Sequence, residues 1–163
     1  MTSKPALYLE STIISYLAAY PSRDLIVAAH QQITHEWWDR ARSKFSNYVS
    51  QAVLDEISVG DPDAASRRLA LVTGLPILAL TEEVEFLAKE YLQKLGLPRG
   101  AQLDVVHLAC AVFYEVDYLL TWNCAHLANG LVIKRLQRVN AALGRPTPVI
   151  ATPEELLTSP GGV

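Results

Sequence analysis

Residues 100–130 read GAQLDVVHLACAVFYEVDYLLTWNCAHLANG, and this stretch indicates both a fold class and a candidate site. Apolar residues recur at three- and four-residue steps over residues 102–114, which predicts a helix. The apolar run over residues 118–122 has the length and composition of a buried strand. A helix followed closely by a strand is one unit of an alternating α/β chain.

Asp104 is the unusual residue of this stretch. It shares a helix stripe with His107, Leu108 and Ala111, which are otherwise largely apolar and are expected to face the protein interior. An inward carboxylate is costly unless it is paired, hydrogen-bonded or bound to a cation. Two interpretations stay open on these residues alone. The side chain either faces water at a helix start, where the helix dipole favours negative charge, or faces inward as a ligand.

The rest of the chain repeats the alternation of strand and helix. Strands are expected at residues 6–9, 47–50, 76–80, 118–122 and 149–151. Helices are expected over residues 13–19, 24–44, 63–72, 81–94, 102–114 and 126–143, with shorter ones after Ser50 and Thr152. No linker or internal repeat interrupts this order. We therefore predict one α/β domain over residues 1–158, with a parallel sheet covered by helices on both faces, and a flexible tail over residues 159–163.

Composition narrows the class of protein. The 163 residues are 50% hydrophobic, which excludes a disordered chain and suits one domain with a substantial core. No apolar run reaches the length of a membrane span, and two cysteines do not form a disulfide framework, so a cytoplasmic protein is expected. The formal net charge of −3 argues against binding nucleic acid through bulk positive charge.

Further polar side chains follow the predicted strands. Glu10 comes directly after the first strand, Glu56 lies on the apolar side of the helix after the second, and Asn123 follows the fourth. The ends of parallel strands converge at one edge of a sheet, where such folds place their sites. Crowded carboxylates repel one another, and Mg²⁺ or Mn²⁺, which prefer oxygen ligands, relieve that repulsion. The alternative for Glu10 is a linker acid before a helix capped by Ser11 or Thr12.

Other motifs and residues give weaker indications of a functional site, or none. The sequence has no GxxxxGK[ST] or GxGxxG loop for phosphate and no GxSxG nucleophile elbow. His107 is more typical of a hydrogen-bonded core histidine than of a ligand, and His126 is either a helix cap or a substrate contact. Trp37 and Trp38 are adjacent in a helix and cannot both face inward, so one is expected at a groove or an interface.

Four segments, in this order, resemble the PIN domain. They are YLESTIISYL (8–17), SQAVLDEI (50–57), QLDVVHLACA (102–111) and DYLLTWNCAHLAN (117–129), and they look most like the VapC-like toxins of toxin–antitoxin pairs. The resemblance implies a five-stranded parallel sheet sandwiched between helices and a Mg²⁺- or Mn²⁺-dependent endoribonuclease acting on RNA. It also implies a small antitoxin that covers the site, and a homodimer. Nothing in the sequence indicates which RNA is cleaved.

The resemblance also implies roles for individual residues. Glu10, Glu56 and Asp104 correspond to the acidic metal-binding motif, and Thr12 and Asn123 to positions that orient water or substrate. Glu10 stands where the family usually has Asp, and Asn123 where it often has Asp. Asn123 brings no charge, so we expect one ion in the free protein, held mainly by Glu10 and Asp104, and a second that binds weakly and arrives with the substrate phosphate. Asp117 is the nearest other acid that could supply the missing charge.

Two other functions remain open. The first is a binding module with the same fold and weak or lost catalysis, which acts through protein contacts and is motivated by Asn123 and the low charge. The second is a small-molecule α/β enzyme, which has less support because no cofactor motif is present.

Overall fold

The computed structural model describes residues 3–158, so the predicted flexible tail at 159–163 lies outside the described part of the chain. Its sheet has five strands: β1 (Ala6–Leu9), β2 (Ser46–Ser50), β3 (Ile77–Leu78), β4 (Tyr118–Leu120) and β5 (Val149–Ala151). All pairs are parallel, in the order β3-β2-β1-β4-β5. The predicted five-stranded parallel sheet is confirmed.

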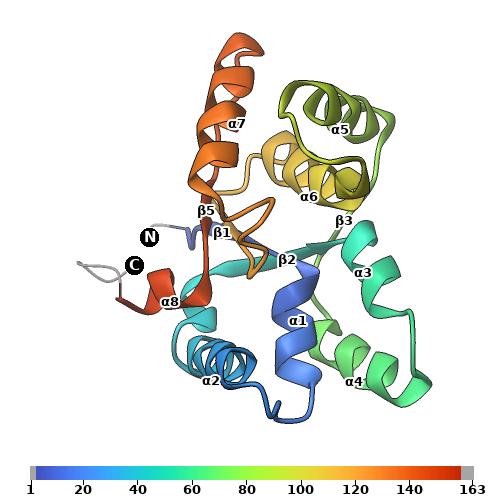
Figure 1. Cartoon of the computed structure of the whole chain (residues 1–163), viewed down its shortest axis with the longest axis vertical. Coiled ribbons are helices and arrows are strands. Elements are labelled where there is room, and N and C mark those ends of the chain that lie inside the picture. Colours follow the sequence, from blue (N-terminus) through green and yellow to red (C-terminus); the bar gives the residue numbers. More distant parts are fainter. Residues whose placement is uncertain (1–2, 159–163) are drawn as a thin grey trace.

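Helices lie on both sides of this sheet. They are α1 (Ser11–Ala18), α2 (Leu25–Arg40), α3 (Gln51–Ile57), α4 (Pro62–Val72), α5 (Glu82–Lys94), α6 (Gln102–Phe113), α7 (Gly130–Ala142) and α8 (Pro153–Thr158). Short 3₁₀ turns occur at Arg42–Lys44 and Arg99–Ala101. Figure 1 shows α1, α2 and α4 grouped on one side of the strands and α5, α6 and α7 on the other. Within residues 3–158, no helix is both long and apolar enough to span a membrane.

Several element ends differ from the sequence expectation. The strands expected at residues 76–80 and 118–122 are shorter, at Ile77–Leu78 and Tyr118–Leu120. The prediction that Ser11 or Thr12 caps the first helix is wrong: Glu10 is the N-cap of α1, and its carboxylate accepts the Thr12 N–H at 3.1 Å. The helix expected over residues 24–44 ends at Arg40 and continues as a 3₁₀ turn. The helix expected over residues 126–143 begins at Gly130, because Asn129 caps it there.

The two adjacent tryptophans have different environments, as expected. Trp37 is fully buried in the core, whereas Trp38 is half-buried and has the Arg42 guanidinium 4.1 Å above its ring. Neither tryptophan therefore presents an uncovered ring face to solvent. The exposed apolar side chains of α2 lie at its start instead, where Leu25 is 86% and Ile26 is 70% exposed.

A series of largely buried hydrogen bonds joins α5 to α7. The Tyr91 hydroxyl on α5 donates to Asn140 Oδ1 on α7 at 2.5 Å, and Asn140 Nδ2 donates to Thr147 Oγ1 at 2.8 Å. Tyr91 and Asn140 are both 0% exposed. Each group therefore depends on the other, because water cannot replace a lost partner inside the core.

We predict that Asn140→Leu lowers the free energy of unfolding by about 1–3 kcal/mol, because it leaves the Tyr91 hydroxyl buried without a partner. The double variant Tyr91→Phe/Asn140→Leu should lose less than the sum of the two single variants, since it removes both partners together. Urea unfolding of the four proteins measures this coupling. Strict additivity would contradict it.

Candidate metal centre

The sheet order brings three chain segments to one edge. Glu10 follows β1, the helix that carries Glu56 follows β2, and Asn123 follows β4. Because β2, β1 and β4 are neighbours, the carboxyl ends of these strands are adjacent. Asp104 reaches the same edge from the first turn of α6. The fold therefore places the predicted site residues at one edge, as is usual for open α/β sheets.

Glu10 is a buried carboxylate, with only 3% of the residue exposed. Its Oε1 accepts from Ser11 Oγ at 2.9 Å. Its Oε2 accepts from Thr12 N at 3.1 Å, from Thr12 Oγ1 at 2.5 Å and from Thr121 Oγ1 at 2.8 Å. All of these donors are neutral, so they orient the carboxylate without supplying a compensating positive charge.

Ser11 links Glu10 to Glu56. Its Oγ lies 2.9 Å from Glu10 Oε1 and 2.9 Å from Glu56 Oε2, and its single proton can serve one of them at a time. On the other side of Glu56, Oε1 lies 2.5 Å from His107 Nε2. One ligand atom from each of Glu10, Glu56 and His107 lies within 4.8 Å of the others.

His107 belongs to a longer buried chain of hydrogen bonds. Its Nδ1 lies 2.6 Å from the Tyr8 hydroxyl, which lies 2.7 Å from Ser50 Oγ. Ser50 in turn caps α3 by accepting the Val53 N–H at 3.2 Å. A continuous polar path therefore runs from the cap of α3 through the sheet to the Glu56 side chain on the same helix.

Asp104 is held separately, by the segment after β4. Its Oδ1 accepts from Asn123 Nδ2 at 3.0 Å, and its Oδ2 lies 2.6 Å from His126 Nδ1. Asn123 Oδ1 also accepts the His126 N–H at 3.0 Å. The Asp104 side chain is 19% exposed, so the interpretation of a fully solvated helix-start acid does not describe it. Asp104 is not a member of the tight group formed by Glu10, Glu56 and His107.

The remaining predicted residues support these two groups. Thr12 donates to Glu10 and accepts the Trp122 N–H at 2.9 Å, so it joins α1 to the segment after β4. Ser11 and Thr121 were missed by sequence reasoning; the available signal was a hydroxyl at each strand end. Asp117 lies at the opposite end of the sheet, where it accepts the Ala6 N–H at 2.7 Å, and it cannot supply the missing charge.

The donor set suits a hard divalent cation. Glu10 and Glu56 converge on one neutral hydroxyl. Glu10 Oε1 and each Glu56 oxygen take one described partner and keep acceptor capacity, whereas Glu10 Oε2 already takes three donors. Carboxylate oxygens are the ligands that Mg²⁺ and Mn²⁺ prefer. A cation between the two side chains would offset the repulsion of crowded carboxylates.

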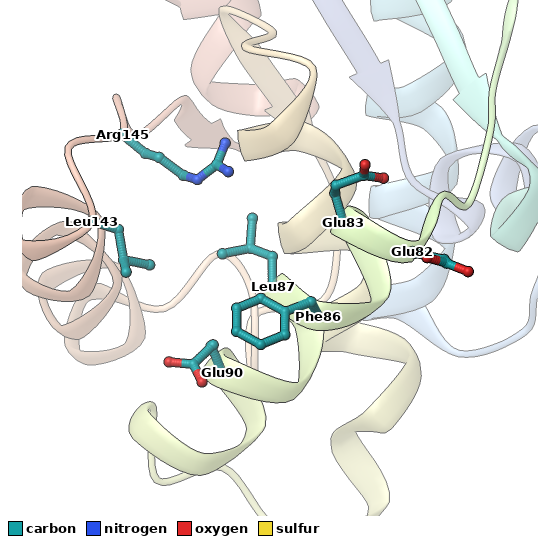
Figure 2. A pocket seen from close by; sticks show the side chains of 7 residues that line it. All are labelled: Glu82, Glu83, Phe86, Leu87, Glu90, Leu143 and Arg145. Atoms are coloured by element: carbon teal, nitrogen blue, oxygen red, sulfur yellow. The ribbon is translucent and has the colours of Figure 1, made fainter.

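A separate hollow of about 490 Å³ lies away from this edge, between α5 and the end of α7. Figure 2 shows Leu143 and Arg145 on one side of it and side chains of α5 on the other. It is lined by Glu82, Glu83, Phe86, Leu87, Glu90, Leu143 and Arg145. None of these is a candidate site residue, so the acidic edge of the sheet remains the candidate centre.

The Glu56–His107 pair makes stability depend on pH. Burial is the largest single influence and opposes charge on both groups, but their mutual hydrogen bond and the surrounding charges and hydrogen bonds together outweigh it, so the pKa of Glu56 is lowered and the pKa of His107 is raised. The charges of Glu10 and Asp104 also raise the pKa of His107. Stabilisation by His107 is therefore complete below its unfolded pKa of about 6.5 and is lost as pH rises through the raised folded value. Stabilisation by Glu56 is lost as pH falls through its lowered folded value.

We predict that, in chelator, the melting temperature of the wild-type protein falls as pH rises above about 6.5. The His107→Gln variant should lack this fall, because its side chain does not titrate. Differential scanning calorimetry of both proteins between neutral and alkaline pH provides the test. Parallel curves for the two proteins would show that His107 is not the titrating group.

Comparison with known proteins finds similarity of fold. No family model and no curated protein matches the sequence. VapC20 of Mycobacterium tuberculosis, a Sarcin-Ricin loop cleaving toxin, is similar with a TM-score of 0.58 and 15% identity, covering 74% of this chain and 92% of its own. VapBC2 of Rickettsia felis, bound to a DNA fragment from its promoter, is similar with a TM-score of 0.58 and 15% identity, covering 90% of this chain and 98% of its own. The five-stranded parallel sheet and its surrounding helices therefore form a PIN-like fold, similar to that of these proteins.

Proposed function

We propose that this protein is a divalent-metal-dependent endoribonuclease that hydrolyses RNA phosphodiester bonds. The observation that carries the proposal is the convergence of Glu10 and Glu56 on one hydroxyl at the carboxyl edge of the sheet. These carboxylates have neutral donors and one histidine around them, but no lysine or arginine of the described chain forms an ion pair with either. The arrangement favours a cation, and the VapC-type fold favours a nuclease.

Glu10, Glu56 and Asp104 would hold Mg²⁺ or Mn²⁺. Such an ion, when bound, would activate water and offset the negative charge that develops on a phosphate during hydrolysis. The chain itself orients the ligands: Thr12 and Thr121 hold Glu10, and Asn123 and His126 hold Asp104. The His126 side chain is 30% exposed, so it would also be available to contact substrate.

A protein partner fits beside Glu56. A groove of about 290 Å³ is lined by Ala52, Asp55, Glu56, Val59, Leu80, Leu103 and Val106. Two of these apolar side chains are well exposed, Val59 at 70% and Leu103 at 55%. An apolar surface next to a carboxylate suits a segment with apolar and basic side chains. The antitoxin of a toxin–antitoxin pair would bind there and cover the site.

A homodimer is part of the same proposal. Trp37 and Trp38 do not support it, because one is buried and the other lies under Arg42. The exposed Leu25 and Ile26 at the start of α2 do support it. Gel filtration with light scattering at micromolar concentration measures the mass, and a monomer there would contradict this part of the proposal.

We predict that the purified protein cleaves RNA with Mg²⁺ or Mn²⁺ and that EDTA abolishes the cleavage. Asp104→Ala should reduce the rate by roughly a hundredfold, because loss of a proposed ligand should cost at least as much as loss of a partner that only orients a ligand. Asp55→Ala is the matched control, since Asp55 is an exposed acid on α3 whose Oδ1 accepts from Gln51 Nε2 at 2.9 Å. A gel assay on labelled RNA compares the three proteins.

Unchanged cleavage by Asp104→Ala would identify a contaminating nuclease. No cleavage by the wild-type protein with either ion, together with no effect of Mn²⁺ on its melting temperature, would favour the binding module.

A second prediction concerns Asn123. Replacing it by Asp places a carboxylate 3.0 Å from Asp104 where an amide now donates, so the metal-free variant should melt at a lower temperature than wild type. The added charge should also tighten a second ion, which in the wild-type protein binds weakly. Mn²⁺ should therefore raise the melting temperature of Asn123→Asp by more than it raises that of wild type.

Calorimetric titration of the free proteins counts the ions. Two tight sites of similar affinity in the wild-type protein would contradict the charge argument for Asn123.

A further inference from the structure

We propose that His107 is a positioning residue: it orients the Glu56 carboxylate for the cation, and Tyr8 and Ser50 hold its ring in place. This inference rests on the proposed function of the acidic edge. It assigns no metal ligation to His107, although His107 Nε2 lies within 4.8 Å of possible ligand atoms of Glu10 and Glu56.

A donor and an acceptor can be assigned consistently to every hydrogen bond between Ser50, Tyr8, His107 and Glu56. An ionised Glu56 carboxylate can only accept, so His107 Nε2–H donates to its Oε1 across 2.5 Å. With a neutral ring, Nδ1 accepts from the Tyr8 hydroxyl, which accepts from Ser50. With a protonated ring, Nδ1–H donates to Tyr8 and Tyr8 donates to Ser50. In both states Nε2 donates to Glu56, so the orientation of Glu56 does not depend on the protonation state of His107.

The rigidity of this chain comes from burial. His107 is 1% exposed, and Tyr8 and Ser50 are 0% exposed. Tyr8 is on the central strand, and its ring lies 5.8 Å from the imidazole in an edge-to-face arrangement. The ring therefore has no room for an alternative orientation that would release Glu56, since buried side chains sit in closely packed positions.

Direct ligation by His107 would require a different arrangement. Nε2 would have to give up its proton and its bond to Glu56 and present a lone pair to the ion. Mg²⁺ and Mn²⁺ favour oxygen ligands over imidazole nitrogen. A histidine that donates to a ligating carboxylate is instead the arrangement by which proteins orient such ligands.

A purely structural histidine is the alternative. The stripe of α6 that carries His107 also carries Leu108 and Ala111, both 0% exposed, and an apolar side chain at position 107 would complete it. The structural role predicts an effect on stability alone. The positioning role predicts an effect on metal affinity that occurs only when Glu56 is present.

The experiment is a double-mutant cycle on Mn²⁺ affinity in the free protein, measured by electron paramagnetic resonance of unbound Mn²⁺. His107→Leu should weaken binding roughly tenfold to a hundredfold, as loss of a partner that orients a ligand does. His107→Gln, whose amide can still donate to Glu56, should restore part of the affinity. Tyr8→Phe should weaken binding by less. In the Glu56→Gln background, His107→Leu should have no further effect.

Two controls separate metal affinity from stability. His35→Leu makes the same change at an exposed histidine of α2 and should leave the affinity unchanged. Tyr91→Phe removes a buried hydroxyl far from the site and should lower stability but not affinity. Circular dichroism melting identifies any variant that fails to fold, in which case His107→Gln and Tyr8→Phe complete the cycle.

The outcomes are distinct. Equal effects of His107→Leu with and without Glu56 would overturn the positioning role while leaving the cation site intact. So would electron spin echo modulation showing a directly coordinated nitrogen that is absent in His107→Leu. Absence of Mn²⁺ binding by the wild-type protein would overturn both this inference and the proposed function.

Discussion

The burial of one carboxylate at the end of the central strand constrains the rest of the site. Glu10 is 3% exposed, and a buried carboxylate is costly unless its oxygens are hydrogen-bonded. The chain meets this cost with hydroxyl and backbone donors from α1 and from the segment after β4. Those bonds tie the first turn of α1 to β4. The Glu10 carboxylate also accepts the Thr12 N–H, so the same side chain caps α1.

The same constraint extends to the neighbouring elements. Ser11 connects Glu10 to Glu56, and His107 connects Glu56 to Tyr8 on the sheet. Asp104 lies one turn before His107 on α6, and its own partners come from the segment after β4. Helix α6 therefore joins two polar groups, one around Glu10 and Glu56 and one around Asp104. Tight packing between α5 and α6 helps hold this helix in place.

Local sequence patterns were enough to predict the fold class and to propose where the candidate site lies. Alternating strand and helix patterns are local properties, so they predicted five parallel strands and most helices correctly. An acid after a strand, as at Glu10, and an acid on an inward helix stripe, as at Asp104, are also local signals. They placed the candidate site at the carboxyl edge because parallel strands end together there.

The tertiary structure alone decided which side chains are partners. Hydrogen bonds such as Thr121 to Glu10, 111 residues apart, and His107 to Glu56, 51 residues apart, join positions with no relation along the chain. Caps depend on which donor a side chain reaches, so Glu10 rather than Ser11 or Thr12 begins α1. Sequence periodicity specifies the face on which a residue lies, but the distance between two faces is set only when the helices pack against the sheet.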